Sequence, residues 1–232
     1  MDANEQRQAL ATIARQVSMC HDCPLYQGTT NPVPGEGNVG AQIMFIGEGP
    51  GFYEDKQGRP FVGASGKFLD ELLASINLDR KKVFITNVVK HRPPNNRDPQ
   101  ADEITACKKY LDAQIEVIEP KVVVTLGRHS MQRYFPGESI SRVHGQPRRK
   151  NGIIVVPMYH PAAALHQQTL RKVIEADFAK LPEFLAKTLN SAAQAPEQVP
   201  EQLRKNPSEN RAAEASAGVE TNPADAQQMR LL

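Results

Sequence analysis

Four short apolar runs, separated by segments of helical character, limit most strongly how this chain can fold. The runs are residues 42–47, 83–89, 121–126 and 153–156. The segments predicted to be helical are residues 68–76, 104–118, 127–134 and 170–185. Short runs rich in branched apolar residues are typical of buried strands, and strand–helix alternation predicts a parallel sheet between two layers of helices. We therefore expect a three-layer α/β/α domain around a four-stranded parallel sheet.

The last part of the chain differs in composition. Residues 191–232 are rich in Ala, Gln, Glu, Asn and Pro and carry almost no periodic apolar residues. Such a composition predicts a disordered tail that follows a folded domain of residues 1–190. The tail has four basic and six acidic residues; since the whole chain carries a net charge of +2, residues 1–190 carry +4. A mildly basic domain is compatible with a polyanionic partner.

Several classes of protein are disfavoured at this stage. No window approaches the roughly 18 apolar residues of a membrane span, and the polar N-terminus has no signal-peptide core. We expect a cytoplasmic protein that does not enter the membrane. Cys20, Cys23 and Cys107 are an odd number of cysteines, which argues against a disulfide framework. The first two form a CxxC pair that follows no strand, so a metal or cluster site is favoured over a thioredoxin-like redox site.

Three unusual loops lie where sheets of this kind bind ligands. They span residues 47–63, 87–97 and 159–166. Each follows a predicted strand, and ligands bind beyond the carboxyl ends of parallel strands. The first loop begins GEGPGF; a dinucleotide-binding GxGxxG motif would need glycine where Phe52 stands, and the lysine of a P-loop is missing. A plain strand–helix turn is the remaining alternative.

Acidic and aromatic side chains in the first loop point to chemistry. Glu48, Glu54 and Asp55 follow one buried strand, where a carboxylate can orient a water molecule or balance a developing cation. Phe61 is either a core residue or a flat wall against which a base stacks.

Three motifs follow one another along the chain: GEGPGxxED with GRPFVGxSG (residues 47–66), ITNVVK with RPPNNR (residues 85–97), and HPAAAL (residues 160–165). Together they resemble the motifs of the family 4 uracil-DNA glycosylases. The resemblance runs from about Cys20 to about Leu185. It implies an enzyme that hydrolyses the N-glycosidic bond of uracil in DNA, releasing uracil and leaving an abasic site.

The resemblance also implies roles for uracil-binding residues. Asn87 would pair with O4 and N3–H of uracil, because a side-chain amide offers both an acceptor and a donor. Phe61 would stack on the base, and His160 would donate toward O2, where negative charge builds as the bond breaks. Gly49 stands where some other glycosylase families carry an aspartate.

The residues that activate water and contact DNA follow less directly from the resemblance. We expect Glu54 to be the main water-activating carboxylate, with Glu48 second and Asn96 in a polar network with Glu54. Leu165 is either a wedge that fills the gap left by the flipped nucleotide or the first core residue of the next helix. Arginines are expected to contact DNA phosphates, although a basic run is also typical of a solvated face; they are Arg97, Arg142 and Arg148.

A 4Fe–4S cluster is implied by the same resemblance, with one departure from the family pattern. Cys20, Cys23 and Cys107 match three ligands, while His91 stands where the usual family member has cysteine. Histidine can replace cysteine on iron, so a mixed ligand set is chemically reasonable. Tetrahedral zinc, a cluster with one labile iron, and a His91 that binds nothing are the alternatives. We expect the cluster to have a structural role, holding the N-terminal segment against the core.

Other expectations concern turnover and partners. A relative of the family crosslinks to DNA through a histidine in an inserted basic loop; the segment after His91 has no such insertion, so we expect hydrolytic turnover. We expect a monomer, with the tail as a candidate docking segment for a repair or replication protein. Three other hypotheses are a catalytically weak DNA-binding or polymerase-associated relative, an iron–sulfur electron carrier and a nucleotide-binding enzyme. Intact Asn87, Glu54 and His160 argue against the first.

Overall fold

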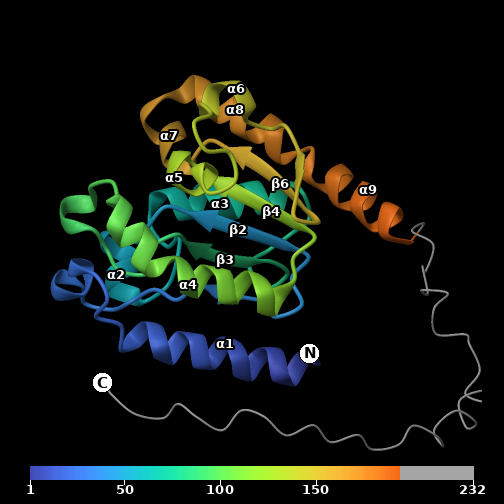
Figure 1. The fold of residues 1–232 in the computed structure, drawn as a ribbon. Coiled ribbons are helices and arrows are strands. Elements are labelled where there is room, and N and C mark those ends of the chain that lie inside the picture. The colour runs from blue at the N-terminus through green and yellow to red at the C-terminus, as the bar shows by residue number, and fades with distance from the viewer. Residues whose placement is uncertain (194–232) are drawn as a thin grey trace, which may run out of the picture. The chain divides into compact units, whose positions relative to one another are not determined.

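Residues 1–193 are described by a computed structural model of the chain, which contains a mostly parallel sheet (Figure 1). Four parallel strands form its centre, in the spatial order β3, β2, β4, β6: Phe84–Asn87, Ile43–Gly47, Val122–Leu126 and Ile153–Met158. Two short antiparallel strands are added at the edges, β1 (Glu36–Gly37) beside β3 and β5 (Arg148–Lys150) beside β6. The predicted mixed α/β class with a four-stranded parallel centre is confirmed, and the edge strands are additional.

The central strands are apolar because helices cover both faces of the sheet. Every residue of β2 and β4 is buried, as is typical of parallel strands between two helical layers. On one face lie the helices α3 (Ala64–Ser75), α8 (Gln168–Phe178) and the start of α9 (Leu181–Ala193). On the other lie α4 (Ala101–Ile118), α5 (Arg128–Gln132) and α6 (Ile140–Val143).

The N-terminal helix adds a further layer outside α4. α1 (Ala3–Ser18) packs against α4 through Ile13 and Val17, which share a cluster with Val117. Figure 1 shows the two helices side by side. The remaining short elements lie in loops: η1 (Pro24–Gly28), α2 (Phe52–Gln57), η2 (Pro94–Asn96) and α7 (Pro161–His166).

Some predicted boundaries are wrong. α4 begins at Ala101, before the predicted segment of residues 104–118, and Gln100 is its N-cap, forming a capping box with Glu103. The single helix expected over residues 170–185 is two helices, α8 and α9, and α9 continues to Ala193. The tail predicted to be disordered therefore lies, from residue 194 onward, outside the described residues. Within residues 1–193, no helix is long and apolar enough to cross a membrane.

Candidate active site

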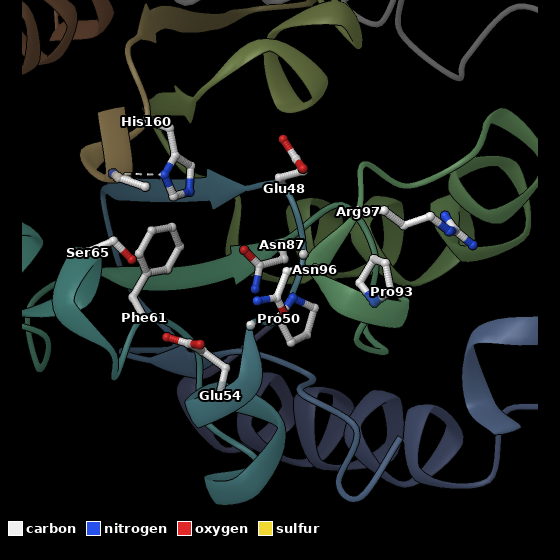
Figure 2. A pocket seen from close by; sticks show the side chains of 13 residues that line it. Glu48, Pro50, Glu54, Phe61, Ser65, Asn87, Pro93, Asn96, Arg97 and His160 are labelled. Atoms are coloured by element: carbon white, nitrogen blue, oxygen red, sulfur yellow. Dashed lines mark hydrogen bonds between the residues drawn. The ribbon is translucent and has the colours of Figure 1, made fainter. Parts of the chain in front are cut away.

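A cavity of about 390 Å³ lies beyond the carboxyl ends of β2 and β3 (Figure 2). It is lined by side chains from all three loops singled out in the sequence, because parallel strands end at the same edge of the sheet. Eight predicted site residues line it: Glu48, Gly49, Glu54, Phe61, Asn87, Asn96, Arg97 and His160. Five residues that the sequence analysis did not assign also line it, all within or beside the quoted motifs: Pro50, Gly51, Ser65, Pro93 and Ala162.

Phe61 forms a flat wall of the cavity. Its ring lies nearly parallel to the ring of His160, with centroids 5.5 Å apart and an interplanar angle of 23°. The Phe61 backbone has φ +53°, which is unusual for an aromatic residue and must be held by its surroundings. One oxygen of Glu54 accepts hydrogen bonds from the backbone N–H of Val62 (2.8 Å) and Gly63 (2.9 Å). Glu54 therefore fixes the loop that presents Phe61.

His160 is held as a neutral hydrogen-bond donor. It is the N-cap of α7, and its Nδ1 accepts from the backbone N–H of Ala162 at 3.1 Å. Since Nδ1 is an acceptor, the ring hydrogen is on Nε2. Burial lowers the pKa of His160 to about 4. At neutral pH the imidazole is therefore uncharged and has one N–H available to a ligand.

Asn87 ends β3 and offers its side-chain amide to the cavity (Figure 2). A Cβ on Gly47 would lie 2.4 Å from Asn87 Oδ1 and 2.6 Å from Phe61 Cζ, so glycine at position 47 leaves the space that both side chains occupy. Nζ of the buried Lys90 donates to the backbone carbonyl of Asn87 at 2.9 Å. Within residues 1–193, no protein group bonds to the side-chain amide of Asn87. The backbone of Asn87 is thus held in place while its side-chain amide is available to a ligand.

The two carboxylates of the cavity have different surroundings. Glu54 is 8% exposed and already bonded to backbone N–H groups. Partial burial raises the pKa of Glu48; the nearby His129 opposes this rise, and the Asp98 carboxylate adds to it. Nε2 of His129 lies 3.8 Å from Glu48 and 3.3 Å from Asp98. Glu48 is thus a more basic carboxylate than an ordinary glutamate.

Asn96 and Arg97 line the cavity from the second loop. Asn96 Oδ1 accepts from Arg92 Nε at 2.7 Å, and its backbone has φ +54°. Arg97 forms a two-pronged ion pair with the buried Glu103, at 2.9 and 2.6 Å. Glu54 and Asn96 have different partners and do not bond to each other.

Comparison with known proteins decides the family of this site. The model of the uracil DNA glycosylase superfamily matches residues 34–191. The chain belongs to this superfamily. It is 55% identical to the type-4 uracil-DNA glycosylase of Sulfurisphaera tokodaii over 186 residues, which cover 76% of this chain and 84% of that protein. Identity to the type-4 uracil-DNA glycosylase of Saccharolobus solfataricus is 51%, with 76% and 87% covered, and to that of Archaeoglobus fulgidus 47%, with 78% and 95% covered. The family 4 resemblance is confirmed.

Three residues that were predicted to contact DNA do not line the cavity. Leu165 in α7 is 49% exposed, so it is not a core residue of the helix; its neighbour Ala164 is buried. Arg142 lies in α6, while Arg148 is in the edge strand β5 and pairs with Glu138 at 2.5 Å.

The residues expected to hold a cluster lie on three different segments. Cys20 follows α1, Cys23 precedes η1, His91 follows β3 and Cys107 is in α4. All three cysteines are free, and His91 is 5% exposed. Burial raises the pKa of Cys107 to about 11, so a bound cation would be needed to deprotonate it.

Three thiols and one imidazole form a donor set that metal sites use. Among residues 1–193, three ligand atoms lie within 4.8 Å of one another only at Glu48, Asp98 and His129, where Arg128 already pairs with Asp98 at 2.5 Å. A single zinc holds its ligands at about 2.0–2.3 Å and thus close to one another. A four-iron cluster spreads its ligands over separate irons and accepts cysteine and histidine, so the donor set fits such a cluster.

Proposed function

We propose that this chain hydrolyses the N-glycosidic bond of uracil in DNA, releasing uracil and leaving an abasic site. The observation that carries the proposal is the meeting of Asn87, Phe61 and His160 in one cavity, each with its polar or flat face available to a ligand. The relatives named type-4 uracil-DNA glycosylases support it.

Base recognition follows from the chemistry of two side chains. The Phe61 ring supplies a stacking surface for a base flipped out of the helix. The Asn87 amide donates to O4 and accepts from N3–H of uracil. Cytosine presents a donor and an acceptor in the reverse order at these positions, so it leaves the buried amide unsatisfied.

Bond cleavage needs stabilisation of the leaving base and a water molecule. As the bond between N1 and C1′ breaks, its electron pair stays on the base, and Nε2–H of His160 donates to the negative charge at O2. A water oxygen bonds to C1′ and loses its proton to a carboxylate. We assign the role of proton acceptor to Glu48, because Glu54 already accepts hydrogen bonds from the loop that presents Phe61.

The direct test is release of uracil from a labelled oligonucleotide, followed by alkaline cleavage of the abasic site. We expect cleavage only at uracil, and none by a variant that combines His160→Ala with Asn87→Ala. Failure of the wild-type chain to release uracil from single- or double-stranded DNA, while it still binds DNA, would favour a non-catalytic DNA-binding protein.

Changing Asn87→Asp tests base choice. A protonated carboxyl offers cytosine an acceptor and a donor in the order it requires, so we expect cytosine release to appear. Uracil release should fall roughly 10- to 100-fold, because one hydrogen bond to a buried group is lost. Release of each base is measured from matched oligonucleotides. The exposed Asn77→Asp is the control, and a variant that loses uracil release without gaining cytosine release would contradict the pairing.

Changing Glu48→Gln tests the water-activating role. In the wild type, uracil release should fall as the pH falls through the Glu48 pKa, which lies above its ordinary value of 4.5, because only the deprotonated carboxylate accepts a proton. Glu48→Gln should lower the rate about 100-fold and remove this acidic limb from the pH profile. Glu71→Gln, on the exposed side of α3, should leave both unchanged. An acidic limb that survives in Glu48→Gln would assign it to another group.

We also propose that Cys20, Cys23, Cys107 and His91 hold a 4Fe–4S cluster. Bound there, the cluster would tie the segment after α1 to the loop after β3 and to α4. Its role would be structural. The loop after β3 continues into Asn96 and Arg97, which line the cavity, so holding this loop would also hold these two side chains in position.

A further inference from the structure

Helix α2 buries its acidic side and exposes its aromatic side, which is the reverse of the usual pattern. Its acidic residues Glu54 and Asp55 are buried, while its aromatic residues Phe52 and Tyr53 are 42% and 59% exposed. Large exposed apolar side chains and buried charges are the informative departures from ordinary burial.

The buried acids of α2 are explained by the fold. Glu54 accepts from two backbone N–H groups of the Phe61 loop, and Asp55 Oδ1 accepts from Thr30 N at 2.8 Å and Asn31 N at 3.3 Å. These bonds fix which side of α2 faces inward. They leave Phe52 and Tyr53 facing outward, with no hydrophobic core to join.

The exposed aromatic residues lie beside the cavity. Gly51, directly before Phe52, lines it. A Cβ on Gly63 would lie 3.6 Å from Tyr53 Cδ2 and 3.4 Å from the cavity carboxylate of Glu54, so Tyr53 lies against the loop that presents Phe61. The two exposed rings meet edge to face, with centroids 5.4 Å apart.

Two cations from different segments of the chain lie against the Phe52 ring. Lys56 Nζ lies 4.6 Å from the centre of the Phe52 ring, and Arg92 Cζ lies 5.1 Å from it. Neither side chain forms a salt bridge within residues 1–193. Arg92 also donates to Asn96, and it precedes Pro93; both of these line the cavity. Uncompensated positive charge beside exposed rings complements a nucleotide, which has a negative phosphate and a flat base.

We propose that Phe52, Tyr53, Lys56 and Arg92 form a second nucleotide subsite, which binds the nucleotide next to uracil on the same strand. This inference rests on the proposed glycosylase function. When uracil leaves the stack for the cavity, the base beside it loses a stacking neighbour, and the exposed Tyr53 ring replaces it. Lys56 and Arg92 contact the adjoining phosphates. The subsite favours single-stranded DNA, in which the neighbouring base is free to turn onto the ring.

The experiment compares two single-stranded oligonucleotides that contain one uracil. One has normal flanking nucleotides, and in the other these carry no base. The full chain and its variants are assayed for uracil release and, separately, for binding by fluorescence anisotropy. Tyr53→Ala should weaken binding and raise KM for the normal oligonucleotide about tenfold, with kcat little changed. It should have no effect on the oligonucleotide with baseless flanks. Tyr53→Phe should restore wild-type behaviour.

Charge and stacking are separated by a second pair of variants. Lys56→Ala should weaken binding of both oligonucleotides and reduce the salt dependence, because it removes a phosphate contact. Lys187→Ala, at an exposed position in α9, should not. Equal weakening of both oligonucleotides by Tyr53→Ala would overturn the stacking subsite. If the chain released no uracil but Tyr53→Ala still lowered binding only where flanking bases are present, the proposed function would fail and the subsite would stand.

Discussion

Replacing His160 by alanine is expected to lower the rate of uracil release by about 100- to 1,000-fold. Loss of one donor to a developing anion typically has this effect on kcat. In the proposed binding mode Phe61 and Asn87 hold most of the base, so KM should change little. Steady-state kinetics on a uracil-containing oligonucleotide measure both quantities.

A matched control is available on the same helix. His166 ends α7 and is exposed, so His166→Ala should leave uracil release unchanged.

In the wild type, the rate of uracil release should show no inflection near pH 6.5. The pKa of His160 is lowered to about 4, so its ring is neutral throughout the neutral range, and we expect the neutral ring to be the donor. A rate that falls as pH rises through 6.5 would indicate that the protonated ring is needed instead.

The position of the site could be predicted from the sequence because it depends on topology. Apolar runs and helical periods predict parallel strands, and parallel strands end together, so Asn87 and His160 meet although 73 positions separate their numbers. The loops that follow the strands then supply the lining. No detailed geometry is required for this step, only the order of the elements.

The different roles proposed for Glu48 and Glu54 could not be predicted from the sequence in the same way. They depend on what surrounds each carboxylate. Glu54 accepts from two backbone N–H groups of a loop in which Phe61 has a positive φ, and this is a tertiary feature without a sequence signal. The same holds for the reversed burial of α2, since helical periodicity predicts that Phe52 rather than Glu54 faces the core. The edge strands β1 and β5 were not predicted, because they are too short and too polar to show the apolar pattern of a strand.

The proposed cluster ligands provide a second test with a large expected effect. His91→Ala should reduce bound iron and the visible absorbance of the purified protein, and Cys107→Ser should abolish both. Loss of the group that joins α1, α4 and the loop after β3 should cost on the order of 4 kcal/mol, or roughly 8–16 °C in Tm for a domain of this size.

His91 can be separated from its neighbours by two further variants. His91→Cys supplies the ligand that the usual family 4 member has at this position, so iron content and Tm should be at least those of the wild type. His21, which is exposed between the two N-terminal cysteines, is the control, and His21→Ala should keep its iron. If His91→Ala kept full iron while His21→Ala lost it, the fourth ligand would be His21. The cluster would then no longer hold the loop that leads to Asn96, and the structural link between cluster and cavity would fail.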